Sequence, residues 1–116
     1  MADLLKMICV PCENDTPPLT ESEIEAYQKV IPNWGVIDDA QGVPRLTRTF
    51  KFNNFVEALA FTNAVGAAAE AAGHHPLIEL TWGRVTVQWW THNINELHQN
   101  DFIMAARTDQ IYFEEN

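Results

Sequence analysis

Apolar positions along the chain follow a helical period in three segments and a strand period in four others. Thr20 and Glu23 have the spacing of a capping box, which predicts a first helix over residues 21–31. A second, longer helix is predicted to end at Gly73. Its apolar stripe consists of Phe55, Ala58, Phe61, Val65, Ala68 and Ala72. A third helix is expected from about Asp101, and its buried side consists of Phe102, Ile103 and Ala106.

The four strand-like segments alternate between apolar and polar residues, as half-buried strands do. The first pair is expected at residues 34–37 and 45–52, joined by a turn at residues 38–42. The second pair follows Pro76 and is divided by Gly83. The residues expected to share one face of a strand are Leu46, Arg48, Phe50 and Phe52; then Ile78, Leu80 and Trp82; then Val85, Val87 and Trp89.

These elements occur in the order α-β-β-α-β-β-α, with connections short enough for hairpins. That order predicts an α+β fold in two layers, a four-stranded antiparallel sheet with three helices packed on one face. Residues 1–18 are interpreted as an N-terminal arm, and residues 19–116 as a single domain. With 116 residues, 47% of them apolar, the chain can bury a core without a disulfide or structural metal.

The charge balance is strongly negative, with 16 acidic residues against 7 basic ones and a net charge of −9. Binding to nucleic acids or anionic membranes depends on clustered lysine and arginine, so neither kind of partner is expected. No apolar run approaches the roughly 20 residues that span a bilayer. The first residues lack the basic and apolar regions of a signal peptide. We therefore expect a soluble, cytoplasmic protein.

Cys9 and Cys12 are the two cysteines and form a single C-x-x-C motif. A four-thiolate zinc site needs a second such pair, which the sequence lacks. The motif also lies about ten residues ahead of the first helix signal, whereas a redox motif of the thioredoxin type lies between a strand and a helix. We expect two thiols of the arm that activity does not require.

Three of the four histidines, His74, His75 and His92, lie within 19 residues of one another. Glu70 precedes His74 by four residues in the last turn of the long helix, where the helix dipole disfavours a carboxylate. Its carboxylate could reach the His74 ring, although a solvated surface role is the alternative. Pro76 restricts His75 to an extended backbone. Imidazoles titrate near neutral pH, so the group suggests proton transfer.

Two more residues belong to the candidate site. Trp90 shares its strand face with His92 and can offer a flat surface to a flat ligand. Asp101 is expected to cap the last helix by accepting backbone hydrogen bonds, more than to act in catalysis. A zinc site formed by three histidines is a weaker alternative, and we expect no metal.

The pattern Glu70-x3-His74-His75-Pro76, followed by Trp82, His92 and Asp101 at fixed intervals, resembles the signature of the pterin-4a-carbinolamine dehydratases. The run L-T-W-G-R-V and the run T-H-N-I, which begins at Thr91, resemble the bacterial members. The likeness spans about residues 19 to 110. His98 departs from it, because many relatives carry serine or threonine there as the helix cap.

The resemblance implies that the protein removes water from 4a-hydroxytetrahydropterin to give quinonoid dihydropterin, which recycles the cofactor of aromatic amino-acid hydroxylases. The pterin would be the substrate, and no cofactor is expected. His74 and His92 would transfer protons, and Glu70 would orient His74. His75 would position the substrate and could also transfer a proton. The family also implies a homodimer or homotetramer. The alternative is a non-catalytic role on the same fold, as a dimerisation or assembly factor or a transcriptional coactivator.

Overall fold

The computed structural model describes residues 4–11 and 16–115 of the chain. These residues form a short 3-10 helix, three α-helices and four strands. In chain order they are η1 (Leu4–Lys6), α1 (Glu21–Gln28), β1 (Gly35–Asp38), β2 (Pro44–Lys51), α2 (Phe55–Ala72), β3 (Leu77–Thr81), β4 (Arg84–Trp89) and α3 (Gln99–Glu115). The expected α+β class and the order α-β-β-α-β-β-α are confirmed.

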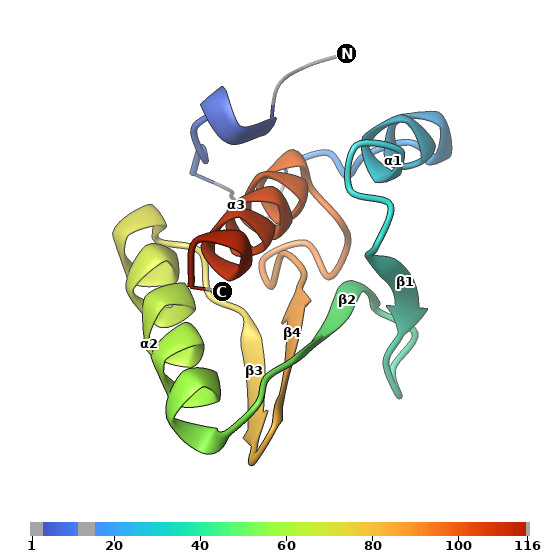
Figure 1. Cartoon of the computed structure of the whole chain (residues 1–116). Coiled ribbons are helices and arrows are strands. Elements are labelled where there is room, and N and C mark those ends of the chain that lie inside the picture. Colours follow the sequence, from blue (N-terminus) through green and yellow to red (C-terminus); the bar gives the residue numbers. More distant parts are fainter. Residues whose placement is uncertain (1–3, 12–15, 116) are drawn as a thin grey trace.

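The sheet has the strand order β1-β2-β4-β3, and each neighbouring pair is antiparallel. Because α2 leads from β2 to β3 while β4 lies between them, this part of the chain is a split β-α-β unit. Helices α2 and α3 cover one face of the sheet (Figure 1). Helix α1 joins this layer through α3, where the rings of Tyr27 and Phe102 stack 5.3 Å apart.

Local capping signals fix where the helices begin and end. The Thr20 hydroxyl accepts from the Glu23 backbone, and the Glu23 carboxylate accepts from the Thr20 backbone, so the capping box is confirmed. Asn54 caps α2 in a similar way through the Glu57 backbone. At the other end of α2, Gly73 adopts a left-handed conformation with φ of 67°, as a C-terminal cap requires.

Three details differ from the sequence predictions. The first helix ends at Gln28, and the chain turns before Ile31. The apolar residues of the stripe on α2 are spaced on average slightly less than the 3.6 residues of one helical turn. The stripe therefore winds around the helix, and its two ends point away from the core. Phe55 is therefore exposed, and Ala69 is more deeply buried than Ala68. Trp82 is exposed and lies in the two-residue β3–β4 turn, rather than on the strand face with Ile78 and Leu80.

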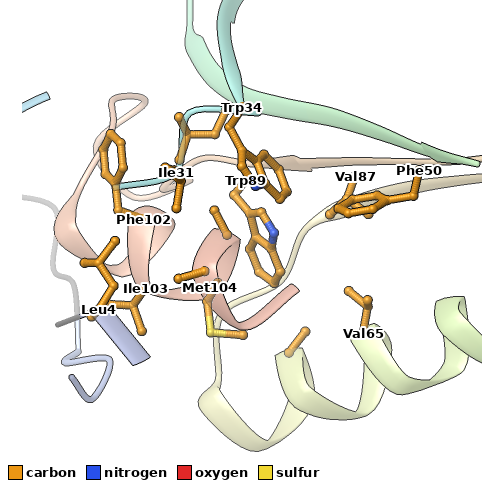
Figure 2. Close-up of a cluster of buried hydrophobic side chains, with 14 of the residues drawn as sticks. Leu4, Ile31, Trp34, Phe50, Val65, Val87, Trp89, Phe102, Ile103 and Met104 are labelled. Carbon is orange, nitrogen blue, oxygen red and sulfur yellow. The ribbon is translucent and has the colours of Figure 1, made fainter. Parts of the chain in front are cut away.

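The core is formed where the inner face of the sheet meets α2 and α3 (Figure 2). Trp89 and Phe50 from the sheet pack toward Val65 of α2 and Met104 of α3, and all four side chains are buried. Leu4 from η1 also belongs to this core and is only 1% exposed. Residues 4–6 of the N-terminal arm are thus packed against the domain, which the sequence did not indicate.

The burial of Leu4 gives a direct test of this packing. Leu4→Ala should lower the free energy of unfolding by about 2–4 kcal/mol, the usual cost of a leucine-to-alanine change in a core. Leu5→Ala is the matched control, because Leu5 is adjacent but 45% exposed, and its effect should be much smaller. Urea unfolding of the two variants measures the difference, and equal losses would show that η1 is not packed.

Candidate active site

The chain brings three segments together at one end of the sheet: the end of α2, the exit of β4 and the start of α3. At the end of α2, Gly73 N–H donates to the Glu70 carbonyl and His74 N–H donates to the Ala69 carbonyl, each at 3.2 Å. This pair of bonds is a Schellman motif, which closes the helix and turns the chain sharply. The motif sets the direction in which His74 leaves α2.

His74 is buried and paired with a fully buried carboxylate. Its Nε2 lies 2.6 Å from Oδ1 of Asp101, and its ring stacks on Trp89 with an angle of 7° between the planes. Because a carboxylate only accepts hydrogen bonds, Nε2 of His74 carries the hydrogen. The pair therefore fixes both the ring orientation and the tautomer of His74, and leaves Nδ1 for other chemistry.

The second oxygen of Asp101 stabilises the surrounding backbone. Oδ2 accepts from the Thr91 hydroxyl at 2.8 Å and from the His98 backbone N–H at 2.9 Å. His98 in turn caps α3, because its Nδ1 accepts from the Asn100 backbone at 3.1 Å. The expected capping role of Asp101 is confirmed, and the same carboxylate also holds His74. The cap of α3 is thus an imidazole, at the position where the resemblance predicts serine or threonine.

The expected contact between Glu70 and His74 is wrong. Glu70 Oε1 instead lies 3.0 Å from Nε2 of His75. The reason is the Schellman turn, which takes His74 off the helical path and inward to Asp101. Both partners of the Glu70–His75 pair are exposed, with side chains 80% and 61% accessible, so water screens their attraction. Pro76 follows directly and leads into β3.

His92 lies just beyond β4 and is exposed. Its Nε2 is 3.4 Å from the His75 carbonyl, and its ring packs 4.5 Å from that of Trp90. Trp90 also contacts Arg45, whose guanidinium lies 3.7 Å from the ring centre. Trp90 therefore supports His92 and does not form the flat pocket wall that the sequence suggested. Arg45 is itself held by an ion pair with Asp39 at 2.9 Å.

A pocket of about 500 Å³ lies where these segments meet, within the size range of small-molecule sites. All three predicted histidines, His74, His75 and His92, line it. Glu70, Pro76, Trp90 and Asp101 lie outside its lining. The remaining lining residues are Cys9, Val10, Pro11, Ala72, Gly73, Thr91, Asn93 and Asn100.

The arm residues of this lining were missed by sequence reasoning. They lie about ninety positions from Asn100 along the chain, and no local pattern links the two. Cys9 was considered only as part of a possible zinc or redox motif, not as a pocket residue. Cys12 lies outside the described residues. Trp82, a fixed position of the signature, lies in the β3–β4 turn and does not line the pocket.

The described part of the chain contains neither a metal-binding cluster nor a membrane-spanning helix. No group of three or more histidine, cysteine, aspartate or glutamate side chains is placed to hold a metal ion among these residues. Within the same ranges, no helix combines the length and the apolar character needed to cross a membrane.

Comparison with known proteins defines the class. A family model described as pterin 4 alpha carbinolamine dehydratase matches residues 17–111, and the chain belongs to this family. A protein of Microcystis aeruginosa is 53% identical over 116 residues, covering 100% of this chain and 99% of its own length. One of Chlorobium limicola is 52% identical over 112 residues, covering 97% and 98%. Both bear the name "Putative pterin-4-alpha-carbinolamine dehydratase".

Solved structures share the fold. A transcriptional coactivator/pterin dehydratase from Brucella melitensis superposes with a TM-score of 0.74 at 32% identity, covering 82% of this chain and 98% of its own. A pterin dehydratase-like protein, described as a RuBisCO assembly factor in the alpha-carboxysome, superposes with a TM-score of 0.59 at 25% identity, covering 69% and 89%. The same architecture thus carries names for catalytic and assembly roles.

The imidazole cap of α3 predicts a pH dependence of stability. Burial lowers the pKa of His98, the charge of His74 acts in the same direction, and the Asp101 carboxylate opposes both. The unfolded chain, with an ordinary histidine pKa near 6.5, then binds a proton more readily than the folded protein. The stability contributed by His98 is complete above about pH 6.5 and declines as the pH falls toward the lower folded pKa.

His98→Asn tests this prediction, because asparagine is a good helix cap that does not titrate. Urea unfolding at pH 7.5 and pH 5.5 should show a larger loss of stability on acidification for the original protein than for the variant. Identical losses would mean that His98 does not contribute to the pH dependence.

Proposed function

We propose that this protein dehydrates 4a-hydroxytetrahydropterin to quinonoid dihydropterin by general acid–base catalysis. The observation that supports this most is the buried His74–Asp101 pair at the edge of a pocket that two more histidines line. A buried carboxylate that fixes one imidazole, next to imidazoles open to solvent, provides proton donors and acceptors near neutral pH. Family membership supplies the substrate class.

The reaction needs two proton transfers. The C4a–O bond breaks as an acid protonates the departing hydroxyl, and water leaves. N5 gives its proton to a base, and a C4a=N5 double bond forms, so the atoms and charges balance. We assign the two transfers to His74 and His92, and substrate positioning to His75. The histidine Nδ1 atoms are the available groups on His74 and His92, because each Nε2 faces an oxygen acceptor.

The composition of the pocket suits a pterin, which is flat, nearly neutral and rich in hydrogen-bonding groups. Its described lining contains imidazoles, a buried threonine and two asparagines, without a lysine, arginine or carboxylate. A phosphorylated or strongly anionic ligand would find no fixed positive charge there. The neutral lining thus favours the carbinolamine over charged substrates. The product would re-enter the cofactor cycle of an aromatic amino-acid hydroxylase.

A purely binding role is the alternative, since the names of two structural neighbours include a coactivator and an assembly factor. Such a role does not require a buried His–Asp pair, whose burial carries a cost in desolvation. The retention of all three histidines around one pocket favours catalysis.

We also propose a homo-oligomer, a dimer or a tetramer. Strands β1 and β3 are the edges of the sheet, and unpaired edges invite pairing with another chain. Phe55, Val56 and Leu59 add exposed apolar surface along α2. Light scattering at micromolar concentration should give two or four times the chain mass of 13.2 kDa, and a stable monomer would contradict the proposal.

The decisive test of the catalytic assignment is stopped-flow measurement of carbinolamine dehydration. His74→Ala and His92→Ala should each slow the chemical step by about 10²–10⁴-fold, the usual scale for general acid–base catalysis. His98→Ala is the matched control, because His98 caps α3 and does not line the pocket. Equal rates for folded His92→Ala and His98→Ala would refute the assignment. A chelator should leave the original activity intact, and its loss with recovery on adding zinc would favour a metal enzyme.

The two carboxylates should differ sharply in the same assay. In Asp101→Asn, the new NH₂ group faces either Nε2 of His74 or the donors at the start of α3, where a carboxylate oxygen accepted before. This change disturbs the His74 tautomer and should slow dehydration about 10²–10⁴-fold. Glu70→Gln removes only an exposed partner of His75 and should cost less than about tenfold. A larger loss for Glu70→Gln than for Asp101→Asn would reverse the roles of the two carboxylates.

A further inference from the structure

The N-terminal segment forms one side of the pocket, although it precedes the region that defines the family. Cys9, Val10 and Pro11 line the pocket, whereas the family model begins at residue 17. Two anchors hold the segment upstream of this point. Leu4 is buried in the core, and Arg107 of α3 donates to the Met7 carbonyl at 2.7 Å. The segment is therefore fastened to the domain before it reaches the pocket.

A third anchor lies at the pocket itself. Asn100 of α3 is 2% exposed, and its amide contacts both backbone groups of Val10. Its Oδ1 accepts from the Val10 N–H at 3.0 Å, and its Nδ2 donates to the Val10 carbonyl at 2.7 Å. An amide side chain carries both a donor and an acceptor, so it can pair with one residue's backbone as a neighbouring strand would. Alanine, aspartate or serine cannot reproduce both bonds.

The amide is also placed next to the proposed catalytic apparatus. The backbone N–H of Asn100 donates to the imidazole of His98, and the next residue, Asp101, holds His74. One turn of α3 thus positions both the arm and the buried histidine. A change in the docking of the arm would alter the shape of the pocket without moving the His74–Asp101 pair.

We propose that Cys9–Pro11 is a specificity-determining wall of the pocket and that Asn100 is the positioning residue that holds it. The identity of the ligand, a pterin, rests on the proposed function. The wall faces the pocket with a valine, a proline and a thiol, none of which is a general acid or base of the imidazole kind. Its contacts are made equally to the bound substrate and to the transition state, so they contribute to binding rather than to the chemical step.

The two hydrogen bonds between Asn100 and the Val10 backbone form a clamp, and two substitutions break it from opposite sides. Asn100→Ala removes both bonds from α3, and Val10→Pro removes the donating N–H from the arm without changing the domain. Each should raise KM for the carbinolamine by roughly 5- to 20-fold while kcat stays within about threefold. This result is expected when a contact made equally to the bound substrate and to the transition state is lost. Asn63→Ala, at an exposed position of α2, is the matched control and should change neither constant.

The double variant separates positioning by the clamp from a direct contact. If Asn100 acts through Val10, combining Asn100→Ala with Val10→Pro should raise KM no further than either change alone. Effects that multiply would show that Asn100 touches the ligand independently, which would overturn its assignment as a positioning residue. A fall in kcat at constant KM would also overturn the proposal.

Alkylation of Cys9 gives a readout that does not depend on turnover. In a Cys12→Ser background, maleimide labelling should be slowed by 7,8-dihydrobiopterin, which would occupy the pocket beside Cys9. Asn100→Ala should accelerate labelling several-fold, because the arm is released. If the protein lacks dehydratase activity but Asn100→Ala still accelerates labelling, the proposed function fails and the clamp stands. Unchanged labelling in Asn100→Ala, with normal activity, would overturn the clamp alone.

Discussion

The structure around the candidate site depends on one buried carboxylate. Asp101 accepts hydrogen bonds from the His98 backbone, the Thr91 hydroxyl and the His74 ring, and thereby joins the start of α3, the exit of β4 and the end of α2. A charge removed from water this completely is tolerable only because its oxygens are well supplied with donors. Removing one partner from such a pair typically costs about 3–5 kcal/mol, so the site and the fold share this interaction.

The first turn of α3 concentrates several functions in four consecutive residues. His98 caps the N-terminus of α3, Asn100 binds the Val10 backbone of the arm, and Asp101 binds the buried His74. Backbone donors at a helix start otherwise lack partners, and here the N–H groups of His98 and Asn100 are bound by side chains of the same turn. The side chains of Asn100 and Asp101 make the links to distant segments. The exposed pair of His75 and Glu70 is screened by water and contributes little to stability. Its effect is to orient the His75 ring.

Local signals were enough to predict the elements, and long-range contacts were not. The capping box at Thr20, the left-handed Gly73 and the inward alternation of β4 each depend on neighbours a few residues away, and each was confirmed. The partners of Glu70 and Trp90 depend on the exact turn after α2 and on Arg45, which lies on a different strand. The pocket wall requires residue 10 to meet residue 100, and no periodicity encodes that meeting.

The left-handed glycine at the end of α2 has a consequence for how this fold can vary. Each helical residue is rotated by about 100° around the helix axis from the one before it. The residue at which α2 ends therefore sets the direction in which the two following histidines leave the helix. Adding or deleting one residue within α2 would swing both imidazoles about a quarter turn away from the pocket, even if the helix itself were undisturbed. The position of the two histidines therefore requires α2 to keep its number of residues between Asn54 and Gly73.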